Sequence, residues 1–479
     1  MKRFVEEHDR TQSILFPERL DDYIDVENPI RVVDAFVEAL DLNEVGFERV
    51  IPKSTGRPGY HPSTLLKMYL YGYLNRIQSS RRLELEASRN IEMMWLIGQL
   101  APDFKTIADF RKDNGNAIRQ VCREFVEICR RLDLFSSSMI AIDGSKFKAV
   151  NSKRNNDTQA NMKRRIARVE ASIDKYLKLL DETDTGERSD HKLSEVDLNN
   201  KLAGLKQEMD NLKVREKAVR MDPDKQISRT DPDSRLLQKG RMGMIVGYNA
   251  QTAVDTKYKL IVAHDVTTAI SDRDQLSPIT KLVQDALKQK DLTVLADRGY
   301  YSGAEINACY RSGAKALVPK NYTSTSKAAG LYDKADFVYN KKKDIYTCPA
   351  DEVLIRRFDT LDKGVKVACY YAPQPVCGAC QLKSKCTVGK TRRVRRREYD
   401  DLLEKMAVDL KKIPEAVVLR ASTVEHPYGT IKCWMGAQHF LMKRQKNVRT
   451  EMSLHVLAYN MKRMLSIFGT QVLVDAIRA

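Results

Sequence analysis

Three acidic residues stand in short motifs that lie far apart in the chain. They are Asp143 in Ile-Ala-Ile-Asp-Gly, Asp297 in Val-Leu-Ala-Asp-Arg-Gly-Tyr and Glu425 in Val-Glu-His-Pro-Tyr-Gly. Carboxylate oxygens are the ligands that Mg²⁺ and Mn²⁺ prefer, and two such ions can stabilise both the attacking and the leaving oxygen of a phosphodiester displacement. Together the acids predict a two-metal site. Singly, each has a plainer interpretation: an Asp-Gly turn, a pair between Asp297 and Arg298, and a solvated surface acid.

The residues around the third acid suggest how it would be presented. Glu425 is expected in the first turn of a helix that begins near Thr423, and Lys432 follows seven residues later. Seven residues make two helical turns, so both side chains are expected on one face, where they would contact metal and DNA phosphate. A solvated Glu and Lys on a surface helix is the alternative.

The elements that must position these acids alternate between strand and helix. Strand patterns cover residues 139–143, 245–255, 260–267, 292–296 and 316–319, and helical patterns cover residues 275–288 and 302–312. This order indicates an α/β fold with a mixed sheet of the ribonuclease H-like type, spanning residues 133–479. In such a sheet the strands that end at Asp143 and Asp297 are neighbours, and ligands gather at the carboxyl ends of strands.

Two further regions have a mainly helical pattern. Residues 1–132 are predicted to form an all-helical domain, in which residues 61–77 and 79–86, with Arg81 and Arg82, form either a DNA-reading helix-turn-helix or part of a plain bundle. An insertion at residues 154–235 is also predicted. Within it, residues 162–219 have apolar residues at alternating steps of four and three, in two runs that a polar loop at 184–189 separates. This pattern predicts an antiparallel coiled-coil hairpin with a spacer or dimerisation role.

A second insertion, at residues 320–397, contains clustered cysteines. Cys377-x-x-Cys380, Cys386 and the upstream Cys348 form a candidate structural zinc site. An iron–sulfur cluster and a set of unliganded thiols are the alternatives. The other cysteines singled out are predicted to be ordinary buried residues: Cys122, Cys129, Cys309 and Cys433.

The charge balance favours a polyanionic partner, because 82 Lys and Arg outnumber 64 Asp and Glu and give a net charge of +18. A basic run at 390–397 is expected either to follow the DNA backbone or to be a solvated face; its arginines are Arg392, Arg393, Arg395, Arg396 and Arg397. Trp434 is expected in the core, with stacking on an unpaired base as the alternative. No apolar run approaches membrane-spanning length and no signal peptide is evident, so a cytoplasmic protein is expected.

In combination, these motifs resemble the DDE transposases of bacterial insertion sequences. The stretches that begin at His61, at Pro102 and at Arg444 look like the N-terminal domain and the closing segment of that group. The resemblance implies that Asp143, Asp297 and Glu425 are the catalytic triad.

The resemblance also bears on the DNA contacts around the last acid. One branch of the family has a Tyr, Arg, Glu, Lys signature, in which Glu425 and Lys432 keep the spacing. Arg420 is one position further from Glu425 than that signature expects, and the Tyr position falls on a Val near 417. Arg298, Arg420 and Lys432 are thus candidate DNA contacts.

For partners, the resemblance implies double-stranded DNA, both terminal inverted repeats and target, and a homodimer in the synaptic complex. It places the protein in the bacterial cytoplasm, associated with the nucleoid. Two rivals remain: a structure-specific nuclease on the same fold, and an inactive transposase-derived regulator that only binds DNA.

Overall fold

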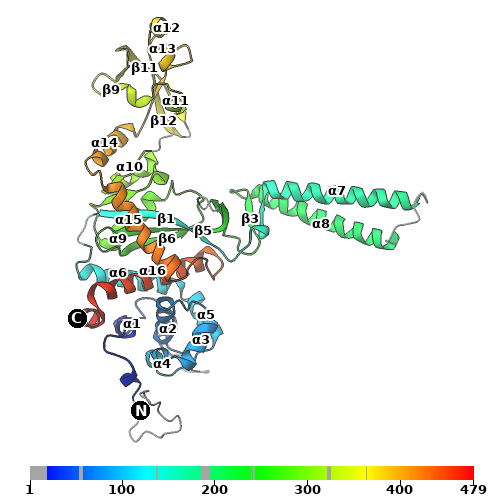
Figure 1. Cartoon of the computed structure of the whole chain (residues 1–479), viewed down its shortest axis with the longest axis vertical. Helices are drawn as coiled ribbons and strands as arrows, with labels where there is room; N and C mark the ends of the chain where they lie inside the picture. Colours follow the sequence, from blue (N-terminus) through cyan, green and yellow to red (C-terminus); the bar gives the residue numbers. More distant parts are fainter. Residues whose placement is uncertain are drawn as a thin grey trace, which may run out of the picture.

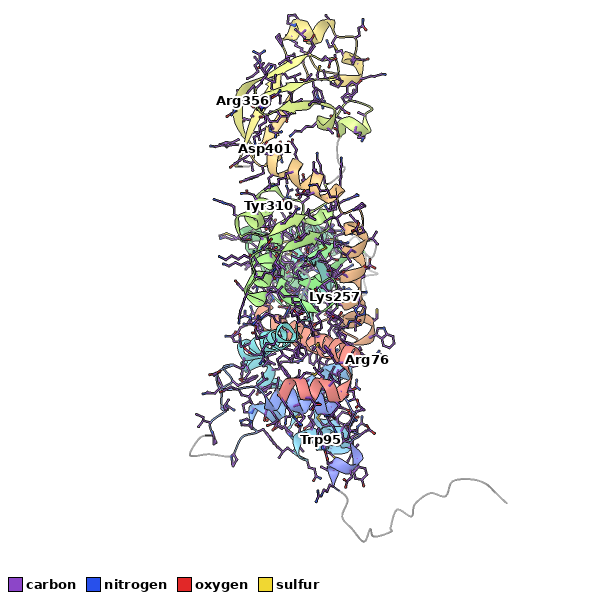
Figure 2. All side chains as sticks on the ribbon, turned by 90° about the vertical axis from the view of Figure 1, so that its left-hand side faces the viewer. Arg76, Trp95, Lys257, Tyr310, Arg356 and Asp401 are labelled. Carbon is purple, nitrogen blue, oxygen red and sulfur yellow. The ribbon has the colours of Figure 1, made fainter. Side chains whose placement is uncertain are left out.

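The computed structural model describes residues 19–52, 58–135, 139–184, 195–238, 240, 243–320, 325–362 and 364–478. Three regions follow one another along the long axis, and a helical arm projects to one side (Figure 1). In the side view, Trp95 and Arg76 lie toward the helical end, Lys257 and Tyr310 on the central body, and Arg356 and Asp401 toward the far end (Figure 2). Within these ranges, none of the helices has the length and apolar character that crossing a bilayer requires.

The central body is built on a six-stranded mixed sheet with the order β4-β5-β1-β7-β8, and β6 pairs with β5. The strands are β1 (Met139–Lys148), β4 (Arg235–Gln238), β5 (Met244–Asp255), β6 (Ile261–Thr267), β7 (Thr293–Ala296) and β8 (Lys315–Leu317). β1 runs antiparallel to β5 and parallel to β7, and β7 runs parallel to β8. The sheet and the helical N-terminal region confirm the predicted mixed α/β class.

The first strand is longer than its sequence pattern predicts. The expectation that it ends at Asp143 is wrong, because Gly144 to Lys148 continue the antiparallel ladder with β5. Gly144 does not start a turn here. A Cβ at this position would lie 2.5 Å from Asp272 Oδ1, so there is no room for a side chain between β1 and the segment that carries Asp272. Asp143 therefore lies in the middle of a strand.

Helices cover this sheet and join it to the N-terminal region. The body helices are α9 (Leu276–Leu287), α10 (Gly303–Arg311), α14 (Asp400–Lys411), α15 (Ala416–Gly429) and α16 (Gln445–Phe468). α17 (Thr470–Arg478) follows α16 and packs against α1 (Ile30–Glu38) of the N-terminal region. The N-terminal elements are η1 (Leu20–Tyr23), α1 (Ile30–Glu38), α2 (Pro62–Leu74), α3 (Ser80–Arg89), α4 (Ile91–Ile97), α5 (Phe104–Asp113) and α6 (Gly115–Arg131). α16 packs against α6, α2 and β6, so one hydrophobic core runs through both regions. The boundary near residue 132 stays a prediction.

The arm consists of two long helices, α7 (Gln159–Asp184) and α8 (Glu195–Met221). At its base lie η2 (Lys153–Asn155) and a two-stranded ladder of β2 (Asn156–Thr158) and β3 (Gln226–Ser228). The helices share a small apolar core that includes Met162, Val169, Met209 and Leu212. The predicted loop lies, from residue 185 on, outside the described residues.

The far end carries a five-stranded antiparallel sheet and short helices (Figure 1). Its strands are β9 (Val338–Asn340), β10 (Ile345–Thr347), β11 (Val353–Asp362), β12 (Val365–Tyr371) and β13 (Val394–Arg397). Beside them lie α11 (Thr325–Ala328), η5 (Lys334–Asp336), α12 (Gln374–Ala379) and α13 (Lys383–Cys386). A separate small core of Phe337, Tyr346, Leu354 and Tyr370 holds this region together.

Candidate active site

The first two predicted acids stand side by side on neighbouring parallel strands. The last parallel pair between β1 and β7 is Ile142 with Ala296, and the next residues are Asp143 and Asp297. On its other side, Asp143 is paired with Thr252 of β5. Because β1 and β7 run in the same direction, the two acids reach the same level of the sheet.

Asp143 lies in an environment that disfavours its negative charge. Its side chain is 26% exposed. Burial raises the pKa of Asp143 to about 6, Arg420 opposes this rise, and the negative charge of Asp297 adds to it. A like charge raises the pKa of an acid only when it is near, so the shift agrees with the position of Asp297 beside Asp143.

Asp297 also organises the chain that follows it. Its Oδ1 accepts a hydrogen bond of 2.8 Å from the backbone N–H of Gly299 and so caps the short 3-10 turn η4 (Arg298–Tyr300). Tyr300, at the end of this turn, is fully buried. Asp297 thus has a local structural role in addition to its place beside Asp143.

Arg420 on α15 contacts the first acid. Its Nη1 lies 3.4 Å from Oδ2 of Asp143, and its side chain is largely buried. Arg420 also lines a cavity of about 260 Å³ together with Asp297 and Arg298. Although its spacing from Glu425 departs from the family signature, Arg420 thus brings a cation to Asp143, beside the cavity that Asp297 also lines.

The third acid lies elsewhere on its helix than the sequence predicts. α15 begins at Ala416, so Glu425 is in the middle of the helix, and Thr423 is a fully buried helical residue and not an N-cap. The prediction of a first-turn position is wrong because the apolar residues 416–419 extend the helix toward its N-terminus. Glu425 is exposed. Tyr428, one turn further on, donates hydrogen bonds to the carbonyl oxygens of Asp143 (3.1 Å) and Ala250 (2.7 Å) and ties α15 to the sheet.

Lys432 contacts the sheet, but it does not lie two α-helical turns after Glu425 as predicted. The chain changes to a π-helical turn, η6 (Thr430–Trp434), directly after α15. The Nζ of Lys432 donates to Ser145 Oγ, two residues beyond Asp143, and lies 4.4 Å from the ring centroid of Phe147. Lys432 thus contributes a positive charge beside β1, while the inference of a shared α-helical face with Glu425 does not apply.

A fourth acid, which the sequence reasoning missed, lies beside these residues. Asp272 accepts hydrogen bonds from Asn249 Nδ2 (2.6 Å) and Gln251 Nε2 (2.7 Å), and it pairs with Lys146 Nζ at 2.7 Å. Gln251 also accepts a hydrogen bond from the hydroxyl of Tyr300. These residues come from separate segments, so no local spacing in the sequence indicates the network.

The aspartate pair has the chemistry of a metal site. Two carboxylates meet at one level of the sheet, and burial destabilises the charge of one, so a hard divalent cation between them would relieve that cost. Within the described ranges, however, no three or more His, Cys, Asp or Glu side chains are gathered closely enough to hold an ion as they stand. Glu425 is exposed and would have to turn toward the pair.

The predicted DNA-binding arginines of residues 390–397 divide into two groups. Arg396 is 8% exposed and forms ion pairs with Asp401 and Glu404, and Arg392 donates to the carbonyl of Tyr332 at 2.9 Å. Arg396 is buried and Arg392 is half-buried, and both are bonded within the far region. Their contact with DNA stays a prediction. The exposed members of the run are Arg393, Arg395 and Arg397.

Arg81 and Arg82 are exposed at the start of α3. Figure 1 shows α3 and the far sheet at opposite ends of the molecule, so neither basic group lies at the aspartates. Helix α2, which precedes α3, is almost entirely buried in the helical region.

The four cysteines of the second insertion line one small pocket. Burial raises the pKa of Cys386, and the neighbouring Cys348, Cys377 and Cys380 raise it further, while Arg392 opposes the rise. Cys348 Sγ accepts a hydrogen bond of 3.4 Å from the backbone N–H of Ala350. The fold therefore brings together thiols separated by up to 38 positions, although it does not close them around an ion.

Two predictions of burial are wrong near the end of α15. Cys433 is exposed, in contrast to the buried Cys122, Cys129 and Cys309. Trp434 is 64% exposed, and the cationic groups of Arg76 and Lys462 lie 5.8 Å and 5.9 Å from its ring centroid. Both residues lie in the π-helical turn η6, whose buried residue is Ile431.

Comparison with known families agrees with this arrangement. Residues 18–113 match the family model of a transposase domain (DUF772), and residues 235–461 match that of a transposase DDE domain. The chain belongs to the DDE transposases. The matched DDE region of this transposase includes Asp297, Glu425 and Lys432. Asp143 lies before the matched residues.

Other comparisons add little to this assignment of the transposase. Among solved structures, a piggyBac transposase synaptic complex with hairpin DNA, determined by cryo-electron microscopy, is similar at 7% identity. The match has a TM-score of 0.32 and covers 94% of this chain and 79% of that one. No curated protein sequence matches the chain.

Proposed function

We propose that this DNA transposase binds the terminal inverted repeats of an insertion sequence, cleaves the DNA at the element ends and joins the freed 3′ hydroxyls to target DNA. The observation that carries the proposal is the register of Asp143 and Asp297, which follow the last paired residues of two parallel strands. The strand order of the central sheet supports a ribonuclease H-like catalytic body.

In this proposal Asp143, Asp297 and Glu425 hold the divalent metal, Mg²⁺ or Mn²⁺, as two ions. When bound, these ions supply activation of the attacking water or 3′ hydroxyl and stabilisation of the leaving oxygen. Arg420 balances the charge of Asp143, and Lys432 holds a positive charge beside β1 where a DNA phosphate can approach. The residues position the strands and stabilise charge, and no covalent protein intermediate is needed.

The proposed partners are the two element ends and the target duplex. The helical N-terminal region, with exposed Arg81 and Arg82, would recognise the terminal inverted repeats, and synapsis of two ends would require a homodimer. Arg298 lines the cavity next to Asp297 and is a further candidate contact to DNA.

A strand-transfer assay tests the proposal. Purified protein, labelled element ends and a target plasmid should give cleaved ends and joined products in the presence of Mg²⁺. Cleavage without any joined product would favour the structure-specific nuclease. Binding without cleavage would favour the inactive regulator.

A pair of variants assigns the chemistry to the aspartates. Asp143→Ala should abolish cleavage and leave end binding intact. Asp285→Ala removes an exposed acid on α9 and should leave both unchanged. If Asp143→Ala also abolishes binding, Asp143 is structural and the site assignment fails.

We also propose a structural zinc ion held by Cys348, Cys377, Cys380 and Cys386. The pocket that the four thiols line supports it, as does the pKa of Cys386, which burial raises and the other three thiols raise further. Metal analysis of the purified protein should find about one zinc per chain, as expected for a Cys₄ site. Cys377→Ser with Cys380→Ser should lose this zinc, and the exposed Cys433→Ser should keep it.

Iron in place of zinc would indicate a cluster. Absence of both metals, with the thiols of Cys348, Cys377, Cys380 and Cys386 freely reactive, would overturn the metal proposal.

A further inference from the structure

The arm carries a groove whose lining is dominated by arginine. The groove has a volume of about 660 Å³ and lies between α7 and α8, near the end of the arm that joins the body. Its charged lining consists of Arg165, Arg168, Arg215 and Arg229, with Glu208 as the only acid among its lining residues. A coiled coil that only separates or pairs subunits has no need for such a concentration of one charge.

Two of these arginines are held in place at the arm base. The carboxylate of Asp157, which is 2% exposed, contacts both Arg165 (3.1 Å) and Arg229 (3.6 Å). Both guanidinium groups also donate to the carbonyl oxygen of Arg154, at 2.9 Å and 3.0 Å. One carboxylate is therefore shared by two guanidinium groups. The three groups together keep a net positive charge at a fixed position.

The other two arginines extend the charge along the arm. No ion pair joins Arg168 or Arg215 to an acid in the part of the chain that the structure describes. On α8, Gln207, Asn211 and Arg215 are spaced by four residues and share one face. They span about 12 Å at 1.5 Å per residue, which is the axial rise of about three phosphates of a DNA strand.

The lining does not have the character of a protein-binding surface. Its apolar residues, Val169 and Leu212, are 7% and 4% exposed and belong to the core of the arm itself. No aromatic residue lines the groove, whereas the cores of protein interfaces are enriched in aromatic residues and Met. Guanidinium and amide groups along an open groove are instead suited to phosphate oxygens.

We propose that this groove binds the sugar-phosphate backbone of double-stranded DNA without reading its sequence. The inference rests on the proposed function, since it assumes that the protein acts on DNA. It assigns the arm a direct part in holding the duplex, in addition to any part in spacing or dimerisation.

The test compares a groove variant and a charge-matched control variant of the full-length protein by fluorescence anisotropy, with a conservative variant as a third measurement. Arg168→Glu with Arg215→Glu changes the groove. Lys206→Glu with Lys217→Glu makes the same change in net charge at exposed positions of α8 outside the groove lining. Circular dichroism should show equal helix content for both.

The groove variant should bind both an element-end duplex and an unrelated duplex at least about tenfold more weakly at about 150 mM salt. Between about 50 and 200 mM salt, the slope of log K against log salt should fall in magnitude by about two. The control variant, Lys206→Glu with Lys217→Glu, should change neither the affinity nor the salt slope comparably. Arg168→Lys with Arg215→Lys should keep most of the slope.

Three outcomes would overturn the inference. They are unchanged DNA binding by the groove variant, equal losses in both glutamate variants, and a changed oligomeric state in light scattering with an unchanged salt slope. The last would identify a second copy of the chain as the occupant. If the wild-type protein still cleaves element ends in these cases, the groove inference fails alone and the proposed function stands.

Discussion

At the scale of single residues, Asp143 is held in a position that opposes its ionisation. It lies in the middle of β1, next to Asp297, and burial raises the pKa of its carboxyl group to about 6. Arg420 offsets part of this cost from α15. In the proposed function, a divalent cation bound by Asp143 would offset more of this cost, and its binding would stabilise the folded protein.

Asp143→Asn should therefore stabilise the metal-free protein. The carboxyl group has a pKa of about 6 when folded and 3.8 as its reference value. The folded state thus binds more protons between these values, and its stability falls as pH rises through this window. At about pH 7.5 the substitution should raise the free energy of unfolding by about 1–3 kcal/mol.

Thermal unfolding with a chelator present measures this effect. The difference between the two proteins should fall to about one third at about pH 4.5, where the unfolded chain still ionises at this position. It should vanish only at about pH 3, where Asp143 is neutral in both the folded and the unfolded state. Added Mg²⁺ should raise the midpoint of the wild-type protein and have little effect on Asp143→Asn. A lower midpoint for the variant at pH 7.5 would contradict this account of Asp143.

At the scale of elements, the site depends on how closely β1 and β5 approach one another. Lys148 is paired with Gly247, and a Cβ at Gly247 would collide with the carbonyl group of Phe147. The obstacle is backbone, which cannot rotate away as a flexible side chain can. The antiparallel ladder that carries Asp143 therefore requires glycine at this position.

Gly247→Ala should destabilise the central body by about 2 kcal/mol or more, because the strands must shift apart. Gly204→Ala is the matched control. Gly204 lies in α8 with open space around its Cα, so alanine should there stabilise the helix by up to about 1 kcal/mol. Urea unfolding followed by circular dichroism checks both. Equal midpoints for the two variants would show that the β1–β5 contact tolerates a side chain.

At the scale of the whole molecule, the N-terminal helices and the sheet share one core, while the arm and the far sheet have cores of their own. Arg111 of α5 belongs to this shared core. Its Nη1 donates to the hydroxyl of Tyr73 at 2.9 Å, and its charge lowers the pKa of Glu451 on α16, which burial raises. A buried cation of the N-terminal region thus compensates a buried acid near the C-terminus.

Arg111→Met should cost about 3–5 kcal/mol, because it leaves Glu451 without a compensating charge. The double variant with Glu451→Gln should recover part of this loss. Chemical unfolding of the single and double variants in a mutant cycle measures the coupling. Additive effects of the two substitutions would show that the residues act independently.

The separate core of the arm leads to a different expectation. Replacing residues 159–221 with a short Gly-Ser linker should leave the thermal midpoint of the main body within a few degrees of the wild type. The antiparallel pair Thr158 with Gln226 brings the two ends close enough for such a linker. A large drop in this midpoint, measured by scanning calorimetry, would show that the arm stabilises the body.

The sequence by itself determined the local patterns of this protein. Apolar alternation around Asp143 and Asp297 and the four-three repeats of residues 162–219 depend on neighbours in the chain, so they can be recognised without a structure. The order of these elements, together with the motifs, indicated a mixed sheet and a DDE transposase before any contact was known. The roles of the three acids remain predictions.

Tertiary structure alone decided which residues meet. The start of α15, the exposure of Trp434, the internal bonds of Arg396 and the acid Asp272 depend on segments that are distant in the sequence. Local periodicity contains no information about such partners, because burial and ion pairing are set by whatever packs against a residue. For the same reason, only the pairing of β1 with β7 determines that Asp143 lies beside Asp297.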